Sequence, residues 1–352
     1  MELKELGLRF TYHIYKTRLL KYRTLDKYRA QDLSKYPADL KQILFSKDTD
    51  EFVKLELQKC QNQGFQAISF WEKSYPKDFV NYSNMPPCLY VQGNLSYSEK
   101  SVAIVGSRKA SSYGLSIAYN FSKTLASYNI SIVSGLAYGI DTKAHQGTID
   151  GAGITYAVLG NSLDHLYPKN NRKIRDEIAH NGALISEFPL NTPPAPYHFP
   201  ARNRIISALS DAIVVVEAAE KSGALITVDF ALEQGKEVYA VPGNITNPLS
   251  KGTHQLIKNG AQLIDSIEEL LPDKSLLFNQ KNNNEQFLNK DPLEIEIIGL
   301  LAKKPLSLAE IIDQSSSETS EILKTVTMME MDHTIQLLGG KYTLCERSLY
   351  IP

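Results

Sequence analysis

The stretch SVAIVGSRKASSYG, residues 101–114, changes the character of the chain and decides its fold. Its first five residues form a β-rich, largely apolar run, and a glycine, a serine and an arginine follow before helical sequence begins near Tyr113. The same order recurs in ISIVSGLAYGID, residues 130–141. A short strand that ends in a glycine-bearing turn and opens into a helix predicts a β–α unit.

Similar β-rich runs recur along the chain, and a turn and a helical stretch typically follow each one. They span residues 102–105, 130–133, 154–159, 184–187, 213–216, 238–241 and 262–264. The runs are nearly continuous in apolar residues, which is typical of strands buried on both faces. They predict an α/β domain over residues 66–272 with a doubly wound, mostly parallel sheet. In such sheets ligands bind outside the carboxyl ends of the strands.

The two segments before this domain have different sequence patterns. Residues 1–65 repeat apolar positions at helical spacing and predict a small helical (SAM-like) domain. Its basic residues alternate with tyrosines, which indicates either an auxiliary nucleic-acid surface or a solvated helical face, and we favour the solvated face. Residues 66–100 predict an entry segment with short strands at 66–70 and 89–92.

The tail begins with a polar stretch that contains NQKNNNEQ at residues 279–286, so we predict a linker over 273–292. Three helical stretches and two short strands follow and predict a winged-helix domain over 293–352. This domain is acidic, and its third helix carries the single cation Lys324. Reading DNA requires cations that meet phosphates, so we favour a protein contact or a vestigial role for the tail.

Composition narrows the class of protein. The 352 residues include 38 Lys and Arg against 39 Asp and Glu, a net charge of -1. An apolar share of 43% is ordinary for a globular chain and excludes a collagen-like or wholly disordered one. A neutral total still permits a local basic groove.

No apolar stretch approaches the roughly 20 residues of a membrane span, and no signal peptide is recognisable. The three cysteines are far apart and the histidines are scattered, so we expect no disulfide framework and no metal site. These features predict a cytoplasmic protein without a membrane association.

Glycine-bearing loops follow several predicted strands. The first contains Gly106, Ser107 and Arg108 just before a helix, where backbone N–H groups and the helix dipole favour an anion. Neither GxGxxG at this turn nor a P-loop motif occurs, so we expect no nucleotide cofactor.

The second loop contains Ser134 and Gly135 and leads to Asp141 and His145. A Ser134–His145–Asp141 triad is conceivable, but the serine lacks an elbow context, and an aspartate at a helix start suits capping better. We therefore expect no catalytic residue here.

The stretch HFPARNRII, residues 198–206, is the strongest local signal. Arg202, Asn203 and Arg204 lie beside aromatic residues and can pair with phosphates while the rings stack on bases. The alternative is a capped helix start with an ion pair to Glu217 or Asp211, and we favour the binding site. A further loop contains Lys221, Ser222 and Gly223. So many anion-compatible loops suit a line of phosphates better than a single one.

Taken in order along the chain, these motifs resemble those of the DNA-processing protein A (DprA/Smf) family. The resemblance rests on YPKDF from Tyr75, MPPCLYVQGNL from Met85, GSRKASSYG from Gly106, SGLAYGID from Ser134, LYPKNN from Leu166, SEFP from Ser186, FPARNRIISALS from Phe199, EAAEKSGALIT from Glu217, VPG from Val241 and GTHQLIKNGA from Gly252. It covers about residues 66–270, and the tail is similar to the winged-helix extension of longer members.

The resemblance implies an extended Rossmann-like domain that binds single-stranded DNA without sequence preference and is not an enzyme. It also implies a homodimer that protects incoming DNA in natural transformation and loads the RecA recombinase. By motif position, Arg108, Arg202, Arg204 and Lys221 would contact phosphates. Residues that would let the backbone approach are Gly106, Ser107, Ser134, Gly135, Ser222 and Gly223, with Asn203 in the same site.

The rival interpretation is a nucleotide-cleaving enzyme on the same general fold, of the lysine-decarboxylase-like phosphoribohydrolase type. Those enzymes carry PGGxGTxxE, whereas Pro242-Gly243 is followed here by Asn244. Glu217 would be its only plausible acid. A purely protein-binding scaffold is a second rival, but it leaves the clustered cations unexplained.

Overall fold

The computed structural model describes residues 2–18, 33, 36–82, 84–96, 100–271, 292–301, 304–315, 317–331, 334–338 and 340–344. The chain divides into two compact units, residues 1–271 and 272–352. The predicted linker lies outside the described residues except for its last position, and so does much of the basic, tyrosine-bearing run near the N-terminus.

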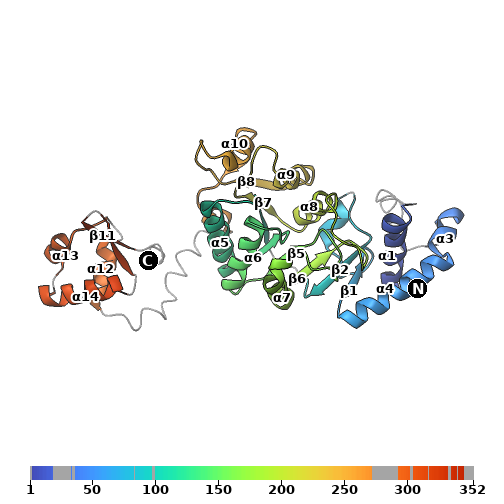
Figure 1. The fold of residues 1–352 in the computed structure, drawn as a ribbon, viewed down its shortest axis with the longest axis horizontal. Helices are drawn as coiled ribbons and strands as arrows, with labels where there is room; N and C mark the ends of the chain where they lie inside the picture. The colour runs from blue at the N-terminus through green and yellow to red at the C-terminus, as the bar shows by residue number, and fades with distance from the viewer. Residues whose placement is uncertain are drawn as a thin grey trace. The chain divides into compact units, whose positions relative to one another are not determined.

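The first unit is built on one nine-stranded sheet with the strand order β1-β2-β6-β5-β4-β3-β7-β8-β9 (Figure 1). The strands are β1 (Gln66–Ser69), β2 (Cys88–Gly93), β3 (Ser101–Val105), β4 (Ser131–Ser134), β5 (Thr155–Val158), β6 (Ala183–Ser186), β7 (Ala212–Val215), β8 (Glu237–Ala240) and β9 (Gln262–Leu263). All seven runs that the sequence predicted as strands of the α/β domain are strands of this sheet.

The pairing of these strands confirms a doubly wound, mostly parallel sheet. Strands β3 to β9 are all parallel and pair in the order β6-β5-β4-β3-β7-β8-β9. The entry strands β1 and β2 are antiparallel to each other, and β2 is antiparallel to β6. The entry segment is therefore the antiparallel edge of the same sheet, which the sequence did not predict.

Helices cover both faces of the sheet, as the apolar runs require. They are α5 (Ser112–Ser127), α6 (Ile140–Asp150), α7 (Arg172–Asn181), α8 (His198–Ala208), α9 (Ala224–Glu233) and α10 (Lys251–Lys258). On one face Val105 and Val215 of the sheet pack with Ile205 of α8 and Val228 of α9. The carboxyl ends of the parallel strands thus open onto loops that lead directly into these helices.

The N-terminal helices are α1 (Leu3–Thr11), α3 (Ala38–Leu44) and α4 (Lys47–Gln63), and a π-helical turn (Tyr12–Lys16) continues α1. Ser46 caps α4 by accepting a hydrogen bond from the Thr49 amide, and Gly64 ends it in a left-handed conformation. Leu8 of α1 and Val53 of α4 pack with Tyr90 of β2 in one core. The helices therefore belong to the first unit, and a domain boundary at residue 65 stays a prediction.

The second unit contains α12 (Pro292–Leu301), α13 (Leu308–Gln314), α14 (Thr319–Met331) and the antiparallel pair β10 (Ile335–Leu338) and β11 (Lys341–Leu344). Ser307 and Glu310 form a capping box that starts α13. These are the elements predicted for the tail, while its assignment to the winged-helix class stays a prediction. Over the described parts of both units, none of the helices has the length and apolar character needed to cross a membrane.

Candidate nucleic-acid interface

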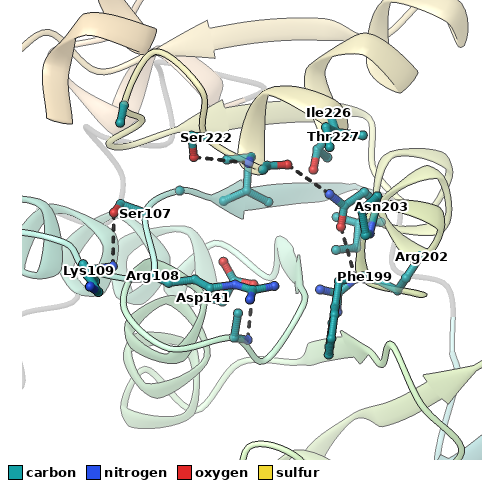
Figure 2. A pocket seen from close by; sticks show the side chains of 18 of the residues that line it. Ser107, Arg108, Lys109, Asp141, Phe199, Arg202, Asn203, Ser222, Ile226 and Thr227 are labelled. Carbon is teal, nitrogen blue, oxygen red and sulfur yellow. Dashed lines mark hydrogen bonds between the residues drawn. The ribbon is translucent and has the colours of Figure 1, made fainter. Parts of the chain in front are cut away.

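A cavity of about 730 Å³ lies at the carboxyl ends of the parallel strands, and we call it the strand-end cavity (Figure 2). It is lined by residues from the loops after β3, β4, β5, β6 and β7 and from α8 and α9. They are Val105, Gly106, Ser107, Arg108, Lys109, Ala137, Asp141, Tyr167, Pro196, Phe199, Pro200, Arg202, Asn203, Ile206, Ala219, Ser222, Gly223, Ala224, Ile226, Thr227 and Leu249. The cations of this lining outnumber its one carboxylate, so the cavity favours an anion.

The loop after β3 supplies the exposed cations Arg108 and Lys109. The Ser107 amide donates to the Glu217 carbonyl at 2.7 Å, and Ser107 Oγ accepts from the Lys109 amide at 3.1 Å, so the loop is tied to β7. Gly106 is required for packing, because a Cβ there would lie 2.7 Å from Ile140 Cγ1. The loop thus presents two exposed charges from an anchored backbone.

Arg108 lies against an aromatic ring in the strand-end cavity. Its guanidinium carbon is 5.1 Å from the centroid of the Phe199 ring, and Tyr167 packs beside the same ring at 5.4 Å between centroids. Figure 2 shows the Arg108 side chain extending toward Phe199. A planar cation next to aromatic rings is the combination that binds a phosphate and an unstacked base.

Arg202 forms the buried floor of the cavity. Its Nη1 donates to the Gly135 carbonyl at 2.7 Å and also to the Val158 carbonyl. A Cβ at Gly135 would lie 2.5 Å from the guanidinium, so this glycine admits the arginine rather than a ligand. Burial lowers the pKa of Arg202 to about 10, and the charge of Asp141 opposes this lowering. The side chain is therefore still charged at neutral pH.

Asp141 is buried and faces the same floor. Its Oδ2 accepts from the Gly135 and Ala137 amides at 3.1 and 3.3 Å. Burial raises the pKa of Asp141, and Arg202 opposes that rise. The carboxylate therefore orders the loop after β4 and balances Arg202, and it is not the helix cap that the sequence suggested.

The opposite wall comes from α8 and from the loop before α9. Asn203 Nδ2 donates to the Gly223 carbonyl at 3.3 Å, and Ser222 Oγ accepts from the Ala224 amide. No heavy atom lies within 4 Å of the position that a Cβ would take at Gly223. The structure thus brings together Gly106, Ser107, Arg108, Arg202, Asn203, Ser222 and Gly223 of the predicted site.

The prediction that Arg204 contacts phosphate is wrong. The side chain is 5% exposed, and its Nη1 and Nη2 donate to both carboxylate oxygens of Glu187, at 2.8 and 2.5 Å. Its Nε donates to the Asn84 carbonyl at 2.8 Å. Arg204 does form an ion pair, as the alternative interpretation expected, but its partner is Glu187 and not Glu217 or Asp211.

Ser134 does not line the strand-end cavity, and its buried hydroxyl donates to the Ile104 carbonyl at 2.7 Å, so its place in the site stays a prediction. His145 Nδ1 pairs with Thr155 Oγ1 at 2.7 Å, and burial lowers the pKa of His145 to about 3. The conceivable triad is therefore not formed. Gly135 lies behind Arg202 and lines a much smaller adjoining cavity. Lys221 is exposed and outside the strand-end cavity, so its contact with phosphate stays a prediction.

Glu217, the acid required by the enzymatic rival, is turned away from the cavity. Its oxygens accept from the Ser111 amide at 2.8 Å and from Ser111 Oγ at 2.6 Å, at the start of α5. Among the described residues no group of three metal-ligating side chains occurs. The predicted phosphate contacts omitted Lys109 and Tyr167, whereas Phe199 was one of the aromatic residues expected to stack on bases. Lys109 adjoins Arg108, and Tyr167 lies in the LYPKNN motif, so both could have been included from the sequence.

Comparisons with known proteins agree with this architecture. The family model of DNA recombination-mediator protein A matches residues 66–274. Protein Smf of Escherichia coli is 36% identical over 286 residues, which is 79% of this chain and 76% of that protein. The DNA processing protein DprA of Streptococcus pneumoniae is 40% identical over 212 residues, 60% of this chain and 75% of that protein.

Two solved structures have the same fold. The X-ray structure of DNA processing protein A from Streptococcus pneumoniae superposes with a TM-score of 0.63 at 33% identity and covers 76% of this chain and 96% of that one. The Helicobacter pylori protein, whose structure is described by its single-stranded DNA binding mode, superposes with a TM-score of 0.54 at 30% identity. The match covers 61% of this chain and 96% of that one. The family description names recombination mediation. The chain therefore belongs to the DNA-processing protein A family, as its motifs suggested.

Proposed function

We propose that the strand-end cavity binds single-stranded DNA without sequence preference. The observation that carries this proposal is the exposed Arg108 held against the ring of Phe199 in a cavity with excess positive charge. Phosphates would pair with Arg108 and Lys109, while the backbone of the loop before α9 approaches the strand.

Stacking gives the reason for a preference for single strands. The ring of an aromatic side chain can stack only on a base that has left the duplex. Every base has a flat face on which such a ring can stack, so the contact is independent of sequence. The Helicobacter pylori relative, described by its single-stranded DNA binding mode, supports the same ligand class for this chain.

The family also supports a cellular role. We propose that the chain acts in the cytoplasm as a homodimer in natural transformation, where it protects incoming DNA and loads the RecA recombinase. Loading can be tested by RecA filament formation on oligo-dT that is covered with single-strand-binding protein. We expect faster filament formation when the chain is added, and an unchanged rate would contradict the loading role.

Binding without catalysis is the expected mode of action. Glu217 is used to hold the start of α5, which leaves the phosphoribohydrolase rival without its acid. Incubation with nucleoside monophosphates should therefore release no base. Release that disappears in Glu217→Gln would favour the enzyme.

The binding proposal is tested by competition at fixed salt. Labelled oligo-dT is bound to the full chain, and unlabelled oligo-dT, mixed-sequence single strands or blunt duplex are added. We expect both single strands to displace the label at similar concentrations, and duplex only at much higher ones. Displacement by duplex at the same concentration would contradict the proposal.

A further inference from the structure

A second cavity, of about 420 Å³, lies beyond the end of β8, and we call it the Tyr113 cavity. It is lined by Tyr113, Pro242, Gly243, Asn244 and Asn247. None of the residues assigned to DNA above lines it. Its lining holds no charged side chain, so it does not suit a phosphate.

The ring of Tyr113 is both exposed and fixed. The side chain is 46% exposed, and its hydroxyl donates to the Pro242 carbonyl at 2.9 Å. The preceding turn is anchored as well, because Ser111 is held by Glu217. A large aromatic face held in place at the surface loses little side-chain entropy when a flat ligand stacks on it.

Hydrogen bonds to the side-chain oxygens of the two asparagines order these side chains and leave their NH₂ groups able to donate. Asn244 Oδ1 accepts from the amide and hydroxyl of Thr246 at 2.9 and 2.8 Å, and Asn247 Oδ1 accepts from the Leu249 amide at 3.0 Å. These bonds use the oxygen of each amide, so the NH₂ groups can donate to carbonyl and ring-nitrogen acceptors such as those on nucleobases. Ile245, 84% exposed on the same loop, adds apolar surface.

The Tyr113 cavity adjoins the strand-end cavity. Leu249 lines the first cavity and Asn247 lines the second, and two residues of chain span at most about 7 Å. Lys109 of the first cavity and Tyr113 of the second are four residues apart, across the start of α5. A strand that leaves the first cavity therefore reaches the second within a few nucleotides.

We propose that the Tyr113 cavity binds an unpaired base of the strand whose phosphates occupy the strand-end cavity. The base stacks on Tyr113, and the amides of Asn244 and Asn247 donate to its edge. This inference rests on the proposed function and adds to it a site that binds a base and makes no contact with a phosphate.

The test compares two ligands of equal length: oligo-dT and an abasic sugar–phosphate oligomer. Tyr113→Leu should weaken oligo-dT binding about tenfold and leave binding of the abasic oligomer unchanged. Arg108→Ala should weaken both ligands. Tyr113→Phe, which keeps the ring, should stay within about threefold of wild type on oligo-dT. Tyr119→Leu, on the same helix and outside both cavities, is the matched control and should bind as wild type.

Equal oligo-dT binding by Tyr113→Leu and wild type would overturn the proposal, as would an equal loss on both ligands. If Tyr113→Leu lowers the stability of the fold, Asn244→Asp replaces it as the test, because the aspartate keeps the oxygen that accepts from Thr246. Asn244→Asp should weaken oligo-dT binding, whereas the control Asn259→Asp, at an exposed position, should not. Equal binding by the two aspartate variants would also overturn it. If wild type fails to bind oligo-dT at all, the proposed function itself fails, which is a distinguishable result.

Discussion

Arg204 and Glu187 form a buried ion pair with two hydrogen bonds, in which the two side chains are 7% and 1% exposed. The Tyr15 hydroxyl donates to the same carboxylate and so joins the N-terminal segment to the end of β6 and, through Arg204, to α8. Arg202, two positions earlier, reaches the strand-end cavity instead. Both arginines are buried: Arg204 is held by a carboxylate away from the cavity, and Arg202 is held by backbone carbonyls beneath it, so a contact of Arg202 with phosphate stays a prediction.

Glu187→Gln should destabilise the first unit by about 3–5 kcal/mol, because it leaves the Arg204 charge buried without its partner. The exposed Glu220→Gln is the control and should change the unfolding free energy by less than about 0.5 kcal/mol. Urea unfolding followed by the fluorescence of Trp71, the single tryptophan, measures both variants. Equal midpoints for Glu187→Gln and wild type would show that the pair is dispensable.

Arg108→Ala should weaken oligo-dT binding about tenfold to a hundredfold, the loss of one charge-assisted contact of roughly 1.5–3 kcal/mol. Its stability should not change, since the side chain is exposed. Lys173→Ala removes an 89% exposed cation on α7, outside the cavity, and should bind as wild type. Fluorescence anisotropy at fixed salt measures all three proteins. Equal loss in both variants would indicate only a general effect of charge.

His145 should make the fold sensitive to acid. Its folded-state pKa, about 3, lies below the ordinary value of 6.5, so the unfolded chain takes up a proton first. The stability that neutral His145 contributes is complete above pH 6.5 and is lost as pH falls toward 3, by at most about 1.4 kcal/mol per unit. Between pH 7 and 5, His145→Asn should lose less stability than wild type does. Parallel loss in both proteins would show that other groups govern the acid response.

Removing the tail should leave binding largely intact. The core of the second unit is made only of its own residues, among them Ile297, Ile311 and Val326, and the cavity lies wholly in residues 1–271. A chain ending at Asp273 should bind oligo-dT within a factor of a few of the full chain. A tenfold loss, about 1.4 kcal/mol, would show that the tail contacts DNA or sets the dimer.

The sequence predicted the sheet well because each buried strand is a short apolar run that ends in a distinctive turn. It also predicted the entry strands β1 and β2, but not their antiparallel pairing at the edge of the sheet, because pairing direction leaves no trace in a short run. The position of Arg108 was predictable from its strand end alone.

The assignment of Arg204 failed for a different reason. Which arginine of a helix meets a buried carboxylate depends on where Glu187 lies in the folded sheet, 17 residues earlier in the chain. The bond from Ser134 to the Ile104 carbonyl joins neighbouring strands, 30 residues apart. Local pattern identifies such polar groups, but only the tertiary structure shows which are already satisfied.

The most direct test of the account is the salt dependence of oligo-dT binding by wild type and Arg108→Ala. Each neutralised phosphate contributes about 0.7 to the slope of log affinity against log salt on a single strand. We expect a steep slope for wild type and a slope about 0.7 smaller for Arg108→Ala. A flat salt response of wild type, or identical slopes for the two proteins, would contradict a strand-end cavity that binds phosphates through Arg108.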